Sequence, residues 1–294
     1  MKLLSALIIA FSLCAASNAN ASECDLKAKT SSSQKSYDPF SPADTVLDVN
    51  VTVKNDGHGN CLARFYVAPV DGRLALSLDG ERIPYRIEGP RGGDSGYPSE
   101  FGPFIANVMS NSSASLAIRF TLPSQNVVPK GMYTSDLVVH GVGLDGERID
   151  VSSGSVILRA QVSGRVEMSI SGTASPQLSQ AGMAAIGMDF GQGRQGDTRR
   201  VFVNVWSNGS VSISLASQNQ GVLKLVGNEH LPAIKYSARF DGSAVSLGGP
   251  YIVQRSPPLS LIGASYELAV TLGEVQNKFA GLYKDVVSIN IDQN

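Results

Sequence analysis

The sequence predicts an all-β protein built from two tandem β-sandwich domains, and periodicity is the first reason. Apolar residues alternate with polar ones over many short stretches, and the clearest stretch runs through Leu47, Val49, Val51 and Val53. A period of two is typical of strands that turn one face to a core and the other to water. Asp-Gly and Asn-Gly pairs, which form tight turns, separate these stretches. Many short strands joined by glycine-rich turns indicate a β-sandwich of immunoglobulin-like architecture.

Repetition is the second reason. Short motifs recur about 150 residues apart in the same order, which is typical of a duplicated unit. They are a Val-x-Val-x-Val stretch followed by a turn, an Ile-x-Tyr motif and a Gly-x-Tyr motif. The paired copies start at Val49 and Val201, at Ile83 and Ile234, and at Gly131 and Gly281. We therefore expect two copies of one domain.

The two copies differ after the Gly-x-Tyr motif. In the first copy further strand-like sequence follows and ends with residues 156–162, whereas the second copy reaches only Asn294. We expect an N-terminal domain at 22–164 and a C-terminal domain at 165–294 that lacks its last strand. The alternative is that the C-terminal domain is a complete sandwich of six strands.

Residues 1–21 have the pattern of an export signal. Lys2 precedes an apolar run at 3–16, and small residues at 19 and 21 form a cleavage site. The run is too short to span a bilayer. Cleavage leaves Cys24 and Cys61, and in an oxidising compartment such a pair predicts one disulfide, with two free thiols as the alternative.

Composition and motif spacing argue against several functions. A net charge of −1 and 17% charged residues give no indication of a nucleic-acid partner. The three histidines lack metal-ligand spacing, so we expect no metal site and no cofactor. Residues 93–96 read Gly-Asp-Ser-Gly, as around a serine-protease nucleophile, but His58 lies too few residues upstream for that fold. We expect no catalytic residues and no enzyme activity.

Several of these residues together resemble the spore coat protein U (SCPU) domain family. They are Cys24 near the expected mature start, Tyr37-Asp38-Pro39, the second Ile-x-Tyr strand with Asp241-Gly242, and the final Gly-x-Tyr-x-Asp-x-Val-x-Ile. The resemblance covers both copies. It implies a subunit of an archaic, Csu-type chaperone–usher pilus. Subunits of this family are immunoglobulin-like domains that lack one strand, which a periplasmic chaperone and then an adjacent pilin subunit supply.

The resemblance also implies a position in the fibre. Only Ser22 and Glu23 would precede Cys24 after cleavage, which is too little for a donor strand. We therefore expect a two-domain tip adhesin, exported through the periplasm and an outer-membrane usher to the pilus tip at the cell surface. It would attach to an abiotic or host surface, hydrophobic or glycan, and promote biofilm formation. A shaft or coat subunit and a secreted carbohydrate-binding module are the alternatives.

The missing strand predicts a groove in the C-terminal domain. An absent strand exposes core side chains and leaves unpaired N–H and C=O groups on its neighbours, where an extended peptide can add. We expect the groove between the first and last strands of this domain. Its predicted residues are Val166, Met168, Ile170, Val287, Ile289 and Ile291.

Surface binding is expected on loops at the far end of the N-terminal domain. The first is 89–107, which is long, rich in Gly and Pro, and carries aromatic residues. The others are 125–130 and 37–42. The predicted binding residues are Tyr97, Phe101, Phe104, Ile105, Val127, Val128 and Phe40. Two alternatives remain for 89–107: its aromatic residues cover the domain's own core, or Arg91, Asp94, Tyr97 and Glu100 form a glycan site.

Overall fold

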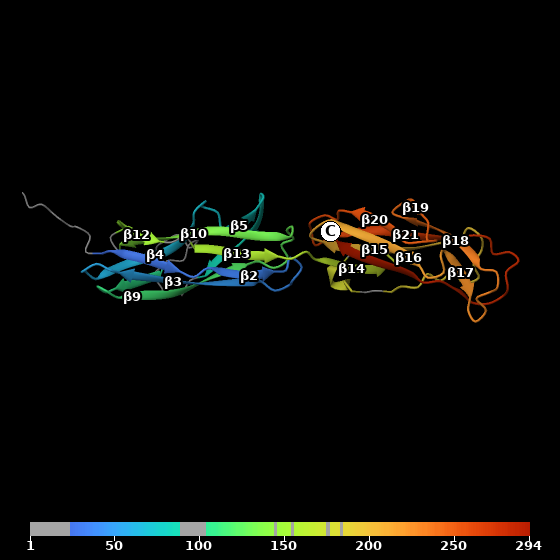
Figure 1. Cartoon of the computed structure of the whole chain (residues 1–294), viewed down its shortest axis with the longest axis horizontal. Coiled ribbons are helices and arrows are strands. Elements are labelled where there is room, and N and C mark those ends of the chain that lie inside the picture. The colour runs from blue at the N-terminus through green and yellow to red at the C-terminus, as the bar shows by residue number, and fades with distance from the viewer. Residues whose placement is uncertain (1–23, 89–103, 144–145, 154–155, 175–176, 183–184) are drawn as a thin grey trace, which may run out of the picture.

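The computed structural model describes residues 24–88, 104–143, 146–153, 156–174, 177–182 and 185–294 (Figure 1). In this part of the chain, strands between residues 26 and 162 form two sheets, and strands between 166 and 293 form two more. We call the first pair of sheets domain one and the second pair domain two. The fold is all-β, and among the described residues the only helical element is the short 3-10 turn η1 (Leu178–Gln180). The two domains lie end to end (Figure 1).

The first sheet of domain one contains the alternating stretch seen in the sequence. The side chains of Leu47, Val49, Val51 and Val53 are all 0% exposed, because one face of their strand packs against the second sheet. The strands follow the order β12 (Val151–Ser153), β1 (Leu26–Thr30), β3 (Thr45–Asn55), β9 (Ser113–Leu122) and β7 (Arg86–Glu88).

The second sheet of domain one contains the last strand of the domain in an interior position. Its strand order is β2 (Ser33–Tyr37), β13 (Val156–Val162), β10 (Gly131–Gly143), β4 (Cys61–Pro69) and β8 (Phe104–Val108). The strands β5 (Ala75–Leu78), β6 (Glu81–Pro84) and β11 (Arg148–Ile149) attach beside this path. Strand β13 pairs antiparallel with β10 and parallel with β2.

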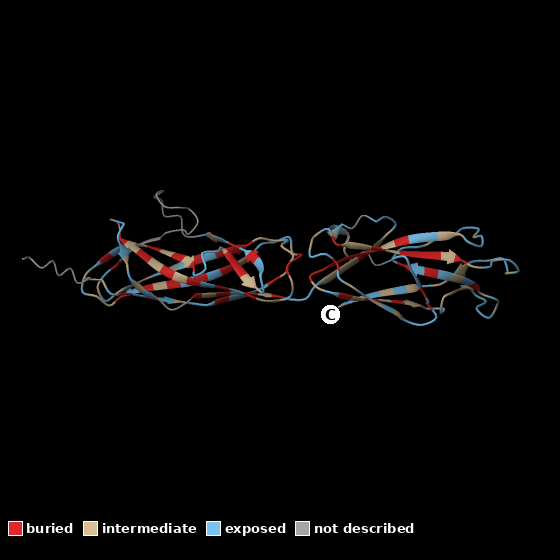
Figure 2. Ribbon diagram, turned by 90° about the horizontal axis from the view of Figure 1, so that it is seen from above, coloured by how far each residue is buried: buried red, intermediate tan, exposed pale blue. Residues whose placement is uncertain are grey.

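Domain two repeats most of this arrangement. One sheet has the order β14 (Val166–Ser171), β15 (Thr198–Ser207), β21 (Ala264–Leu272), β18 (Ile234–Phe240), β17 (Val222–Leu225) and β22 (Tyr283–Lys284), with β19 (Ser243–Val245) on β18. The other has the order β20 (Tyr251–Arg255), β16 (Val211–Ser217) and β23 (Val287–Gln293). Figure 2 shows buried residues along the strands of both sandwiches.

The predicted duplication is visible in matched details of β10 and of β22 with β23. Gly131 and Gly281 have φ of 152° and 154°, and a Cβ on either glycine would collide with a leucine side chain. Two residues later, the hydroxyls of Tyr133 and Tyr283 each donate to the carbonyl oxygen four residues earlier, both at 3.1 Å. Residues of domain one therefore correspond to residues 150 positions later in this segment.

A second matched contact fixes the same correspondence. The hydroxyl of Tyr85 lies 3.1 Å from Ser135 Oγ, and the hydroxyl of Tyr236 donates to Asp285 Oδ2 at 2.6 Å. Asp285 also accepts from Ser217 Oγ at 2.6 Å. The polar contact between these two segments is therefore kept in both domains, although a carboxylate replaces the hydroxyl of Ser135 in domain two.

The predicted disulfide between Cys24 and Cys61 is confirmed. It joins the chain just before β1 to the first residue of β4, at a sequence separation of 37. On the chain-entropy account, closing a loop of this length stabilises the fold by about 4 kcal/mol.

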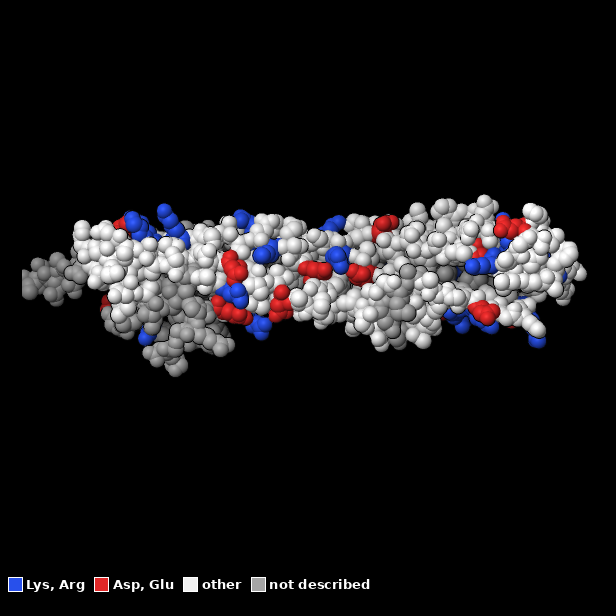
Figure 3. All heavy atoms as spheres, turned by 90° about the horizontal axis from the view of Figure 1, so that it is seen from below, with Lys and Arg blue, Asp and Glu red and all other residues white. Residues whose placement is uncertain are grey.

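The domains meet through polar contacts. Lys130 Nζ donates to the backbone oxygen of Asn294 at 2.6 Å, and the guanidinium of Arg165 lies 3.5 Å from the carboxylate of Asp38. Surface charges of both signs are interspersed on the face drawn in Figure 3.

Candidate strand-acceptor groove

One edge of β23 is open. Strand β23 pairs with β16 along one edge, and among the described residues no strand pairs with its other edge. Its counterpart β10 pairs with β4 on one side, and with β13 and β11 on the other. The edge that is covered in domain one is therefore uncovered in domain two.

The direction of the backbone groups along β23 follows from one contact. The N–H of Asn294 donates to the carbonyl oxygen of Ser210 at 3.0 Å, on the side of β16. Backbone groups of successive strand residues point to opposite edges. The N–H groups of Asn290 and Asp292 thus face β16, and those of Ile289 and Ile291 face the open edge.

Core side chains along this open edge are uncovered as well. Leu137 and Val139 of β10 are 0% and 3% exposed, whereas their counterparts Val287 and Ile289 are partly exposed. Tyr133 is 0% exposed, and its counterpart Tyr283 is partly exposed. Full burial of an apolar side chain is worth about 1.5–3 kcal/mol, so covering this row would stabilise domain two.

The opposite wall is β14. In domain one the corresponding strand β1 carries β12 on its outer edge, and its residues Leu26 and Ala28 are 2% and 6% exposed. In domain two β14 pairs with β15, no second partner strand appears among the described residues, and Val166 and Met168 are partly exposed.

A groove of about 450 Å³ lies between the two walls. It brings together four of the six residues predicted from the sequence. The lining residues are Val166, Met168, Ser214, Ile289, Asn290, Ile291 and Asp292. The other two predicted residues, Ile170 and Val287, are partly buried and pack against the core of domain two. Strand binding by these six residues remains a prediction.

The sequence analysis did not identify a third segment that borders the groove, the counterpart of β2 in domain one. In domain one β13 also pairs with β2, which ends at the buried Tyr37. Met188 lies at a similar distance before β15, and it packs against the core of domain two as Tyr37 does in domain one. Residues 185–190 form no strand, and Ile186 is 43% exposed. The spacing of Tyr37 and Met188 ahead of β3 and β15 is the sequence signal that could have identified this segment.

Two of the three predicted binding loops lie at the wrong end of domain one. The prediction placed Phe40, Val127 and Val128 at the end remote from domain two, but Tyr37 pairs with Val162, which leads directly into domain two. Phe40 is 7% and Val128 2% exposed, and Val127 is partly buried.

The physical reason is the hydroxyl of Tyr37, which donates to the carbonyl oxygen of Pro123 at 2.8 Å and accepts from the N–H of Asn126 at 3.3 Å. These bonds hold residues 123–128 over the core at the junction. Phe40 lines a hollow of about 360 Å³ there, together with Arg165 and Glu167.

The third predicted loop, 89–107, starts after β7, which pairs with β9, and its last residues belong to β8, which pairs with β4. Tyr97 and Phe101 lie outside the described residues, as do the alternative glycan residues of this loop. Phe104 and Ile105 belong to β8, where they pair with Phe65 and Arg64 of β4, so they are strand residues and not loop residues. Glu88, the last described residue before this segment, pairs with Arg119 within β9.

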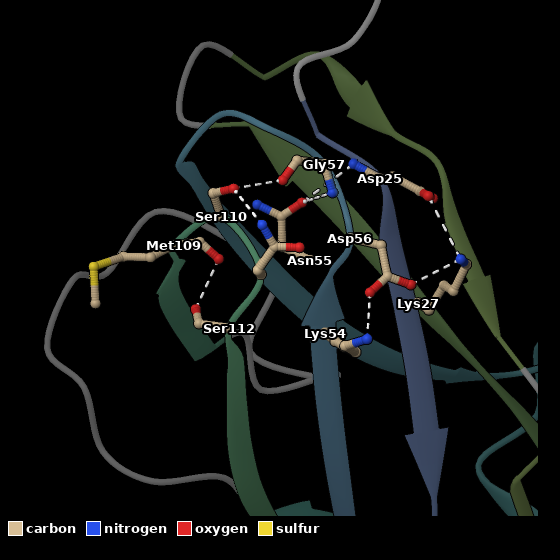
Figure 4. Close-up of polar contacts among 10 residues, drawn as sticks. Asp25, Lys27, Lys54, Asn55, Asp56, Gly57, Met109, Ser110 and Ser112 are labelled. Atoms are coloured by element: carbon tan, nitrogen blue, oxygen red, sulfur yellow. Dashed lines mark hydrogen bonds and ion pairs between the residues drawn. The ribbon is translucent and has the colours of Figure 1, made fainter.

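Among the described residues, two turns form the end of domain one remote from domain two. The β3–β4 turn and the turn at 109–112 meet there around Asn55, which is 0% exposed (Figure 4). Its side chain donates to the carbonyl oxygens of Gly59 and Val108 and accepts from the N–H of Gly57. Met109 beside this network is 58% exposed, and the sequence analysis did not identify it.

Ion pairs around Asp56 also link β1 and β3 at the remote end of domain one. Lys27 Nζ lies 2.8 Å from the carboxylate of Asp56, and Lys54 contacts the same carboxylate at 2.5 Å (Figure 4). The hydrogen bonds from Lys27 and then Lys54 lower the pKa of Asp56 to about 2.

The described part of the chain holds no cluster of three or more His, Cys, Asp or Glu residues that could bind a metal ion. It also holds no helix long and apolar enough to cross a membrane.

Comparisons with known proteins give matches among solved structures. No protein-family model and no curated protein matches the chain, so the SCPU resemblance remains a prediction. A complex of a chaperone with CsuE, the tip adhesion subunit of archaic chaperone–usher Csu pili of Acinetobacter baumannii, is similar at 11% identity, covering 90% of this chain and 100% of that chain, with a TM-score of 0.40.

Two further solved structures are fimbrial proteins of Escherichia coli. CfaE, the adhesive subunit of the CFA/I fimbria of the enterotoxigenic form, is similar at 11% identity over 92% of this chain and 82% of that chain, with a TM-score of 0.36. AggA, the major subunit of aggregative adherence fimbriae type I, is similar at 15% identity over 48% of this chain and 95% of that chain, with a TM-score of 0.32.

Proposed function

We propose that the chain is a subunit of a chaperone–usher pilus and that domain two joins the fibre by accepting a β-strand from another chain. The observation that carries the proposal is the difference between two equivalent edges. Strands β11 and β13 cover the edge of β10 in domain one, and the matching edge of β22 and β23 is open among the described residues. An added strand would pair the free N–H and C=O groups and bury the partly exposed side chains.

The proposed partners follow from the same edge. A periplasmic chaperone would cover it before assembly, and the adjacent pilin subunit would cover it in the fibre after passage through the outer-membrane usher. We place the chain at the tip, a placement that depends on the expected cleavage after Ala21. N-terminal sequencing of the mature protein tests this placement, and cleavage upstream of Ala16 would contradict it.

Adhesion would then fall to domain one, at the end remote from domain two. The exposed Met109 and the glycine-rich β3–β4 turn lie there. Replacing Met109 with Ser should reduce attachment of piliated cells to a hydrophobic surface without loss of pili, and unchanged attachment would exclude this side chain.

The test of strand acceptance uses variants on the two faces of one strand. The full chain is co-expressed with a periplasmic pilus chaperone, and a 1:1 complex is measured by size-exclusion chromatography with light scattering. Ile289→Asp places a charge in the groove and should abolish the complex, whereas Ser288→Asp on the exposed face of β23 should leave it intact.

Met168→Asp on the opposite wall is a second variant, because one groove variant alone could fail by unfolding the domain. A monomeric, cooperatively folded full chain that forms no complex, or equal effects of Ile289→Asp and Ser288→Asp, would contradict the proposal.

A further inference from the structure

Residues 148–153 and 156–162 of domain one cover the strand edges whose counterparts are open in domain two. Their first part, β11, pairs with β10, and the next part, β12, pairs in parallel with β1. Their last part, β13, enters the second sheet between β10 and β2. Strands β11, β12 and β13 therefore cover both walls, and their register gives the register expected for an incoming strand.

The later half of that register is similar in the two domains. Val156, Leu158, Ala160 and Val162 are all 0% exposed, and they pair with Leu137, Ser135, Tyr133 and Gly131. The corresponding residues of domain two are Val287, Asp285, Tyr283 and Gly281. Alternating apolar residues should therefore fit this half of the groove.

In the earlier half of the register, where β11 pairs with β10, the two domains differ at the position of Gly141. Gly141 of β10 pairs with Ile149, and a Cβ on Gly141 would lie 2.8 Å from Val151 Cγ2 and 3.3 Å from the carbonyl oxygen of Ile149. The segment of domain one thus fits only because residue 141 has no side chain. The counterpart in domain two is Ile291, whose side chain lines the groove.

On β14, the opposite wall of the groove, a larger side chain also narrows the half of the groove near Ile291. Ala28 of β1 corresponds to Met168 of β14, because the two residues pair with the equivalent Val53 and Val205. Both Met168 and Ile291 line the groove. Two small residues of domain one are thus replaced by two large ones.

We propose that Ile291 and Met168 select an incoming strand with a small residue, Gly or Ala, where domain one carries Val151. The selection rests on the proposed strand-acceptor function. The partner is an extended segment of about 15 residues, following the length of the segment that fills domain one. It has alternating apolar residues in its later half and a small residue in its earlier half. A β-branched residue at the small position would overpack the slot and weaken binding.

The test uses synthetic peptides and the full chain. Fluorescein-labelled peptides carry residues 148–162 unchanged, with Val151→Gly, or with Ser152→Gly as a matched control, since Ser152 is exposed in domain one. Binding is measured by fluorescence anisotropy. Residue-resolved amide exchange confirms that each peptide protects Ile289 and Ile291. We expect Val151→Gly to bind about 10-fold or more tightly than the unchanged peptide, and Ser152→Gly to show no gain.

A reciprocal change in the chain makes the test specific. In Ile291→Ala the advantage of the Val151→Gly peptide should shrink to about threefold or less, because the smaller wall accepts valine. Equal binding of the three peptides to the unchanged chain, or an advantage that persists in Ile291→Ala, would overturn the selection but leave strand acceptance standing. Failure of all peptides to bind, while a chaperone complex forms, would overturn the inferred register. Failure of both would overturn the proposed function itself.

Discussion

Tyr133 and Tyr283 provide a matched comparison of a covered and an uncovered slot. Both hydroxyls donate to a carbonyl oxygen four residues earlier at 3.1 Å, so the two side chains differ mainly in their exposure. Tyr133 is 0% exposed and pairs with Ala160 of β13, whereas Tyr283 is partly exposed and has no such partner among the described residues. Removal of a fully buried aromatic ring costs about 3–5 kcal/mol, so Tyr133→Ala should lower the unfolding free energy of domain one by that amount. Tyr283→Ala should cost domain two about 1–2 kcal/mol, because part of its side chain already contacts water.

The assay is equilibrium urea unfolding with two probes. Trp206 is the only tryptophan and is 0% exposed, so its fluorescence reports on domain two, and far-ultraviolet circular dichroism reports on both domains. Tyr133→Phe and Tyr283→Phe are the controls: each removes one similar hydrogen bond, and each should cost about 1 kcal/mol. Equal costs of Tyr133→Ala and Tyr283→Ala in the unliganded chain would refute the reasoning, since they would mean that Tyr283 is already covered.

Three further predictions concern stability. Replacing both Cys24 and Cys61 with Ala should lower the unfolding free energy of domain one by about 4 kcal/mol and leave the Trp206 transition unchanged; a shift of that transition would contradict it. Burial raises the pKa of Tyr85 and of Tyr133 to about 12, above the ordinary value of 10. The protonated hydroxyls therefore stabilise domain one fully below pH 10, and the unfolding free energy should fall as pH rises from 10 through 12. Urea midpoints between pH 9 and 12 test this loss, which the double Phe variant at these two tyrosines should flatten. Asp285→Ser, which installs the domain-one residue, should destabilise domain two less than Asp285→Leu, because a hydroxyl can still pair with Tyr236. Thermal unfolding followed by Trp206 fluorescence measures the difference, and equal decreases in midpoint temperature would contradict it.

The sequence allowed prediction of features that depend on local pattern. The alternation through Leu47 to Val53 predicted a buried strand face, and the repeated Gly-x-Tyr motif predicted the equivalence of β10 with β22 and β23. The same comparison indicated which strand could be missing in domain two, and four of the six predicted residues line one groove.

Features that depend on tertiary contacts were not accessible in this way. Phe40 and Val128 were expected at the remote end of domain one, but the hydrogen bonds of Tyr37 place their loops at the junction. A loop's composition shows that it turns but not which end of a sandwich it closes. The replacement of Gly141 by Ile291 is visible in the sequence, but its meaning requires the register of β11 on β10.

Amide exchange along β23 tests the open edge most directly. In the unliganded full chain the N–H groups of Asn290 and Asp292, which face β16, should be protected, and those of Ile289 and Ile291 should exchange quickly. A chaperone or a donor peptide should then slow the exchange of Ile289 and Ile291 and change that of Asn290 and Asp292 little. Equal protection of all four amides in the unliganded chain would show that this edge is already paired, and the account of domain two as a strand acceptor would be wrong.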